Sequence, residues 1–189
     1  MKIARVFWLG AALCANASMQ SQSLCFDPAS DNRYQCSGWP RDIVSGVFDE
    51  DGHLDVITAN NGEMADFLRG NGDGTFNTPI TITEAGGDEI EAADMNNDGH
   101  LDIVRYSDNN GMVKINLGNG DGTFDAGFSV ASGAIASFMS EIVLGHFDNN
   151  GFLDIAVNDP SAAQVHIIGN LNGSTYLVAA SLPTQESPS

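Results

Sequence analysis

Basic residues are scarce in this chain. Its 189 residues include 7 Lys and Arg against 25 Asp and Glu, so the formal net charge at pH 7 is −18. Such an acidic excess repels phosphate backbones and anionic lipid surfaces, which makes nucleic acid a poor candidate partner and cations better ones. Catalytic signatures are also lacking: the sequence contains no Gly-x-Ser-x-Gly elbow, no His-Glu-x-x-His zinc motif and no Walker-type phosphate loop. These absences favour a binding protein over an enzyme.

Long apolar runs are lacking too. Lys2 and Arg5 form a charged start, and the apolar run at residues 6–15 is about half of the roughly 20 residues that a membrane-spanning helix needs. Residues 15–17, Ala-Asn-Ala, then supply the small-x-small pattern that a signal peptidase cleaves. We therefore predict a signal peptide over residues 1–17, no membrane span, and secretion to the periplasm or the extracellular space.

Cysteine is rare, with three in the chain. Cleavage after residue 17 removes Cys14 and leaves Cys25 and Cys36 as the remaining pair. In an exported protein, two thiols in a polar loop most simply form a disulfide, which for a loop of this size stabilises the fold by roughly 2–3 kcal/mol. Two free thiols are the alternative. We interpret residues 18–42 as an irregular lead-in stapled by the Cys25–Cys36 disulfide.

Glycine, in contrast, is plentiful, and many of the 21 glycines lie in two motifs that occur three times. The first motif is an acidic loop at residues 48–55, 95–102 and 147–154. The second is Gly-Asn-Gly-Asp-Gly-Thr-Phe at residues 70–76 and 118–124, with a worn copy at 169–176. The last Asp of the first motif and the closing aromatic residue of the second are 21, 22 and 22 residues apart. This constant spacing indicates three structural repeats, at about residues 43–90, 91–138 and 139–178, before a polar tail at 179–189.

The periodicity within each repeat is that of β-strands. A short β-rich run follows each acidic loop, and Val113–Leu117 alternates with a period of two, whereas helical spacing is absent. Repeats offset by 47 and 52 residues and built of short strands indicate propeller blades of about four strands each. We therefore predict an all-β fold of three blades. Because closed propellers typically have about four to eight blades, we expect an incomplete propeller, part of a longer array, or one completed by self-association.

The acidic loop carries oxygen ligands in the pattern of a calcium site. In the middle copy, oxygen-bearing side chains occupy loop positions 1, 3, 5 and 9, and Gly99 at position 6 allows the sharp turn. Ca²⁺ takes about six to eight oxygen ligands, which alternate residues of a tight loop provide. An EF-hand is excluded, because Arg105 replaces its bidentate Glu and strands flank the loop. The predicted ligands are Asp94, Asn96, Asp98, the carbonyl of His100 and Asp102.

The outer copies are less complete. Position 1 is Val47 in the first copy, which removes one carboxylate, and His146 in the third, whose imidazole suits Ca²⁺ poorly. We expect one to three bound Ca²⁺ ions, with an Asx-turn loop that binds no metal as the alternative. The ligands expected in the outer copies are Asp49, Asp51, the carbonyl of His53 and Asp55 in the first, and Asp148, Asn150, the carbonyl of Phe152 and Asp154 in the third.

Together, the acidic loop and the Gly-Asn-Gly-Asp-Gly-Thr-Phe motif resemble the FG-GAP/VCBS repeats of integrin-like β-propellers and of many secreted bacterial proteins, over residues 43–178. The resemblance implies that each repeat is one blade whose loop binds Ca²⁺, and that the module serves cell adhesion or binds an extracellular protein or glycan. It also leaves an alternative, since propellers of similar repeats occur in carbohydrate-active lyases and hydrolases. We expect a non-enzymatic binding module in which calcium is structural.

Overall fold

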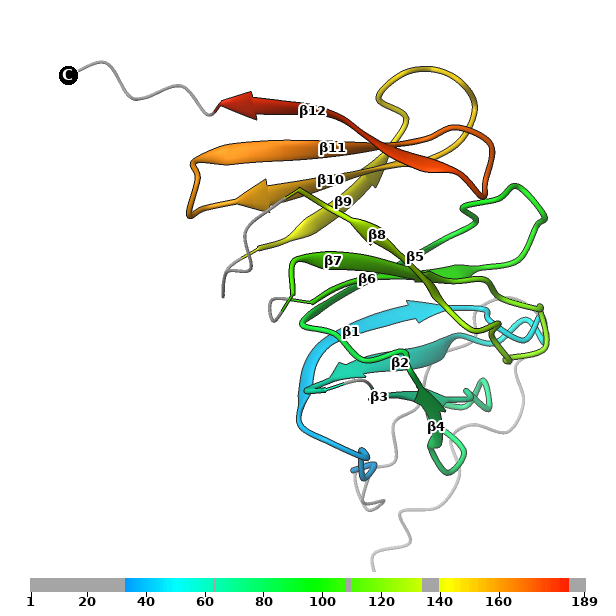
Figure 1. The fold of residues 1–189 in the computed structure, drawn as a ribbon. Helices are drawn as coiled ribbons and strands as arrows, with labels where there is room; N and C mark the ends of the chain where they lie inside the picture. The colour runs from blue at the N-terminus through cyan, green and yellow to red at the C-terminus, as the bar shows by residue number, and fades with distance from the viewer. Residues whose placement is uncertain (1–32, 63, 108–109, 134–139, 184–189) are drawn as a thin grey trace, which may run out of the picture.

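The computed structural model describes residues 33–183, apart from 63, 108–109 and 134–139. The predicted signal peptide, Cys14 and Cys25 lie outside the described residues, and Cys36 is half-buried. Every regular element in this part of the chain is a β-strand (Figure 1). A search of the same residues for a helix with the length and hydropathy of a membrane span found none.

The strands form three sheets of four antiparallel strands each, which confirms the predicted all-β fold of three propeller-like blades. Each sheet is a meander in which consecutive strands pair, in the orders β1-β2-β3-β4, β5-β6-β7-β8 and β9-β10-β11-β12. Figure 1 shows the three sheets stacked in chain order. The bounds are β1 Pro40–Gly46, β2 Asp55–Asn60, β3 Met64–Leu68, β4 Ile80–Thr83, β5 Glu89–Ala93, β6 Asp102–Ser107, β7 Met112–Asn116, β8 Phe128–Ala131, β9 Ile142–Gly145, β10 Asp154–Asp159, β11 Gln164–Asn170 and β12 Tyr176–Pro183.

The hydrophobic cores lie between the blades. Successive side chains of a strand point to opposite faces of a sheet, so the buried strand β6 supplies two cores. Its Ile103 packs towards the first blade, whereas Val104 and Tyr106 pack towards the third. The first core contains Phe48, Ile57, Ala59, Ala65, Phe67, Ala85, Ile90 and Ile103. The second contains Met95, Val104, Tyr106, Val113, Ile115, Ile142, Ile155, Val157 and Ile168.

Neighbouring blades meet along their first strands, because β1 contacts β5 and β5 contacts β9. The backbone N–H of Ile90 in β5 also donates to the Asp42 carboxylate in β1, at 2.9 Å. The three blades do not close into a ring. Apolar side chains are therefore exposed on the outer sheets, as with Ile43 on β1 (62% exposed) and Val143 on β9 (58%).

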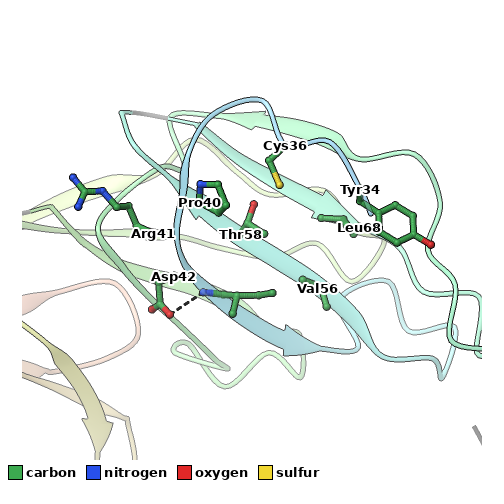
Figure 2. A pocket seen from close by; sticks show the side chains of 9 residues that line it. Tyr34, Cys36, Pro40, Arg41, Asp42, Val56, Thr58 and Leu68 are labelled. Carbon is green, nitrogen blue, oxygen red and sulfur yellow. Dashed lines mark hydrogen bonds between the residues drawn. The ribbon is translucent and has the colours of Figure 1, made fainter. Parts of the chain in front are cut away.

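The lead-in packs against the outer face of the first blade. The Asp66 carboxylate in β3 accepts hydrogen bonds from the Ser37 N–H (2.6 Å) and from the Asn60 side-chain amide (2.8 Å). Beside this contact lies a mostly apolar hollow of about 440 Å³ between the lead-in and β1–β3 (Figure 2). Tyr34 and Cys36 line it from the lead-in. Residues 33–39 are thus held on the blade although they form no strand.

Candidate metal centre

The three acidic loops lie at the same place in each blade. They connect β1 to β2, β5 to β6 and β9 to β10, so the repeated meander brings them to one edge of the array. Neighbouring loops touch there. Glu50 Oε1 of the first loop lies 2.6 Å from His100 Nδ1 of the second, and the Asn97 side-chain amide donates to the Gly151 carbonyl of the third at 3.2 Å.

The last Asp of each acidic loop is a buried hydrogen-bond acceptor that joins the two motifs. The Asp102 carboxylate, fully buried, accepts the Met95 N–H of its own loop at 2.7 Å and the Gly118 N–H of the second motif at 2.9 Å. The same pair of bonds recurs at Asp55, from Phe48 and Gly70, and at Asp154, from Phe147 and Asn170. These bonds explain the constant spacing of the motifs.

The histidines of the first two loops pack on the second motif. A Cβ on Gly72 would lie 2.3 Å from His53 Nδ1, and a Cβ on Gly120 would lie 2.4 Å from His100 Nδ1. Both glycines have φ of +73°, so close approach and backbone conformation both require glycine. The imidazoles of His53 and His100 are thus packed against the second motif, and the backbone carbonyls of these histidines stay the ligands that the sequence predicts.

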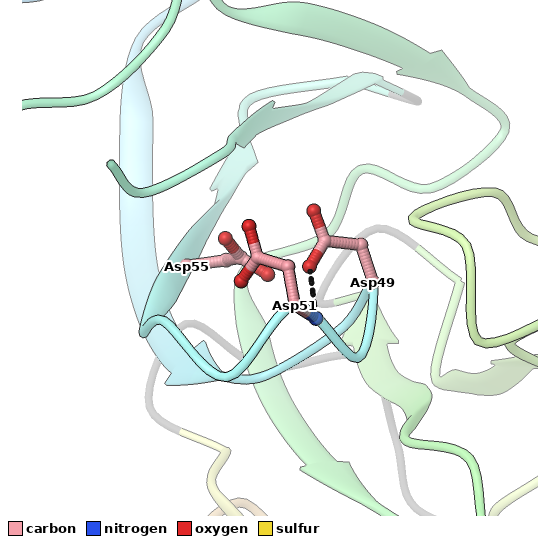
Figure 3. A group of neighbouring side chains, drawn as sticks. All are labelled: Asp49, Asp51 and Asp55. Carbon is pink, nitrogen blue, oxygen red and sulfur yellow. Dashed lines mark hydrogen bonds between the residues drawn. The ribbon is translucent and has the colours of Figure 1, made fainter. Parts of the chain in front are cut away.

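In the first loop, three predicted ligands converge. Carboxylate oxygens of Asp49, Asp51 and Asp55 lie within 4.8 Å of one another, the one group of three metal-binding side chains found so close together within the described ranges (Figure 3). The Asp51 N–H donates to Asp49 at 3.1 Å, and the His53 N–H donates to Asp51 at 2.8 Å. An all-oxygen donor set of this kind fits hard Ca²⁺.

In the middle loop, the predicted ligands turn inward but bond to the loop backbone. The Asp94 carboxylate accepts the N–H groups of Asp98 (3.1 Å) and Gly99 (2.8 Å), and Asp98 accepts the His100 N–H at 2.8 Å. Asn96 donates its side-chain amide to the Asp98 carboxylate at 2.8 Å. The donor set is again all oxygen and includes three carboxylates, so it also fits Ca²⁺.

The third loop fits a metal less well. His146 Nδ1 lies 2.9 Å from the Phe152 carbonyl, the backbone ligand expected in this copy. The Asn150 amide nitrogen donates to the Asp148 carboxylate (3.0 Å) and to the Asn170 carbonyl (2.7 Å). The Asp154 carboxylate accepts the two backbone N–H groups described above. This loop therefore has fewer ligand carboxylates than the other two, and a ring nitrogen contacts its expected carbonyl ligand.

The acidic residues of the second motif accept hydrogen bonds within the turn of that motif. The Asp121 carboxylate accepts the Thr123 N–H at 2.9 Å and also contacts the Thr123 hydroxyl. Asp73 is bonded to Thr75 in the same way. Hydrogen bonds from these threonines lower the pKa of both carboxyls. Asp73 and Asp121 are thus explained without a metal.

Burial has an electrostatic cost at Asp102. Desolvation raises the pKa of its carboxyl from 3.8 to about 6, although the hydrogen bonds from Gly118 and Met95 oppose this shift. The nearby charges of Asp98 and Asp94 raise the pKa further. A neighbouring cation would favour the ionised form, so this carboxylate is better accommodated in a metal-loaded loop.

This shift predicts how stability depends on pH in metal-free buffer. The folded-state pKa of Asp102 is above the unfolded value, so folding takes up a proton, and the free energy of unfolding should fall as pH rises from about 4 to about 6. We expect a loss of about 1–3 kcal/mol across this window. Urea unfolding between pH 4 and 7 should show the loss in the wild type and a flatter profile in Asp102→Asn. Equal pH profiles for the two proteins would contradict this assignment.

Comparison with family models identifies the repeats. Residues 48–105 and 94–157 each match the FG-GAP-like repeat, and together the matches span more than half of the chain. The protein belongs to the FG-GAP repeat family, as its motifs predict. A search of curated proteins found no match.

Proposed function

We propose that this protein is an exported calcium-binding module that acts in adhesion or in binding an extracellular protein or glycan, with calcium in a structural role. The observation that carries the proposal is that an acidic loop recurs at one edge of three FG-GAP blades. Each loop is held by a buried Asp at the same loop position. FG-GAP repeats form propeller-type modules that often serve binding or adhesion, which supports the proposed class of function.

The middle loop is the principal calcium site in this proposal. Its ligands are the side chains of Asp94, Asn96, Asp98 and Asp102 with the carbonyl of His100, and the first loop offers Asp49, Asp51 and Asp55 with the carbonyl of His53. Six ligand carboxylates therefore lie in two loops, which contact each other through Glu50 and His100. Bound calcium supplies the positive charge that offsets their mutual repulsion.

The open faces of the outer blades are the proposed partner surfaces. Their exposed apolar residues, such as Val143, occupy the outer sides of sheets whose inner sides pack against another blade. A second copy of the chain could cover them and complete the propeller. A mass measurement in calcium that gives a single chain would contradict self-association and leave a protein or glycan ligand as the partner.

The experiment that tests the calcium role is thermal unfolding with and without millimolar Ca²⁺, with Mg²⁺ as the ionic control. Calcium at about 100 times its dissociation constant adds about 2.7 kcal/mol of stability per site, so the melting temperature should rise. The rise should be selective for calcium and should shrink strongly in Asp98→Ala. Asp121→Ala, which removes an exposed carboxylate of the second motif, should keep the response. An equal response to both ions, or none, would contradict the proposal.

A further inference from the structure

One of the few basic side chains reaches into the first acidic loop. Arg69 follows β3, and its Nε forms an ion pair with Asp49 Oδ2. The Asp49 side chain is 1% exposed, whereas that of Arg69 is 43% exposed, so the ion pair joins a buried carboxylate to a side chain that reaches the solvent. Arg69 Nη2 also donates to the Asp121 carbonyl of the middle blade at 3.3 Å. The arginine thus links the first loop to the next blade.

The other two blades lack this cation. The buried Asp of each blade bonds to the N–H of Gly70, Gly118 or Asn170, which aligns the three second motifs residue by residue. The residue before this donor is Arg69 in the first blade, but Leu117 in the second and Gly169 in the third. The first loop also has Val47 where the middle loop has Asp94. Because Asp49 stands where the middle loop has Asn96, both loops still have three ligand carboxylates, and the difference in charge at the ligands is the positive charge that Arg69 adds to the first loop.

We propose that Arg69 is a resident counter-cation of the first loop, which neutralises Asp49 without metal and thereby lowers the calcium affinity of that loop below that of the middle loop. The inference rests on the proposed calcium role. A guanidinium in contact with Asp49 occupies an oxygen that the ion needs, and its charge repels Ca²⁺ at short range. Repulsion between these charges in a solvated loop corresponds to at least about a tenfold loss of affinity.

The arginine also stabilises the contact between the first two blades in the absence of calcium. Next to the Asp121 carbonyl that it holds, the Gly122 N–H donates to the Phe48 carbonyl at 3.0 Å, and a Cβ on Gly122 would lie 2.7 Å from the Phe67 ring. The second motif of the middle blade therefore packs against the core between the first two blades. We infer that this junction persists at low calcium, when the middle loop has lost its ion.

The test is a calorimetric calcium titration of the full chain in an Asp98→Ala background, which weakens the middle loop and leaves the first loop visible. Adding Arg69→Leu, the residue that the middle blade has at this place, should tighten the remaining site by about tenfold or more. Arg69→Gln, a second neutral variant, should do the same. Arg69→Lys keeps the positive charge and should keep the weak site.

A second readout is thermal stability in the presence of a chelator. Arg69→Leu should melt below the wild type without calcium and should gain more than the wild type when calcium is added. Arg41→Leu is the matched control, because it removes the Arg41–Asp88 ion pair (3.6 Å) at the junction of the same two blades. It should leave calcium affinity unchanged.

The outcomes separate this inference from the proposed function. Calcium binding by the wild type that disappears in Asp98→Ala, with no tighter site in either neutral Arg69 variant, would overturn the role of Arg69 alone. Failure of the wild type and of all Arg69 variants to bind calcium would overturn the proposed function and this inference with it.

Discussion

Replacing Asp102 with alanine is expected to lower the free energy of unfolding by about 2–4 kcal/mol in metal-free buffer at neutral pH. The fully buried carboxylate accepts the N–H groups of Met95 and Gly118, and its loss leaves two buried donors without an acceptor. Each unsatisfied buried donor costs about 1–3 kcal/mol, partly offset here because a desolvated charge is also removed. Urea unfolding followed by circular dichroism measures the loss.

The matched control for this variant is Asp121→Ala. Asp121 is also an aspartate that accepts two hydrogen bonds, but it is exposed and its bonds lie within one turn. Its removal should cost about 1 kcal/mol or less, because water replaces the lost bonds. If Asp102→Ala cost no more than the control, the buried Asp would not be the link between the two motifs.

Truncation of Phe67 to alanine is expected to cost about 3–5 kcal/mol, the range for a large aromatic side chain removed from a packed core. Phe67 is 1% exposed and lies in the core between the first and middle blades, with its ring centroid 6.3 Å from that of Phe48 in an edge-on arrangement. Because this core joins two blades, the unfolding transition should also become broader.

Ile80→Ala is the internal control for this core. Ile80 pairs directly with Phe67 across β3 and β4, but its side chain is 61% exposed. Its truncation should change the free energy of unfolding by less than about 1 kcal/mol. Similar losses for the two variants would show that the space between the blades is not the stabilising core.

Much of the fold follows from the repeats. The acidic loop, the β-rich run after it and the period-two alternation of Val113–Leu117 predict β2, β6, β10 and β7, and the structure places β7 within one residue of the expected range. The edges of the repeats are harder to predict. β12 extends to Pro183, into the range interpreted as a polar tail, because pairing with β11 orders residues that have little β-propensity of their own.

The candidate site, like the fold, is only partly predictable from the sequence. Residue spacing alone predicts the oxygen ligands, since a loop with Asp or Asn at alternate positions has that pattern in the sequence itself. The second role of Asp55, Asp102 and Asp154, as acceptors that join two motifs, depends on bonds between segments 15 or 16 residues apart. The one sign of this second role in the sequence is the constant spacing between the two motifs.

Arg69 was not predicted to take part in the site. It precedes a glycine-rich turn and lies 20 residues from Asp49 in the sequence, and only the pairing of β2 with β3 brings the two together. A sequence comparison of the three repeats shows Arg69 opposite Leu117, but the charge contact emerges only from the packed blade. Contacts that arise from tertiary packing in a single repeat are the part that internal symmetry cannot predict.

The most direct test of the calcium account is a crystal structure of the full chain grown with calcium, with the ion located by its anomalous signal. We predict an ion in the middle loop, bound by oxygens of Asp94, Asn96, Asp98 and Asp102 and by the His100 carbonyl at about 2.3–2.6 Å. A middle loop without an ion, in which Asp94 still bonds to the Asp98 and Gly99 N–H groups, would contradict the account and leave the loop as an Asx-turn.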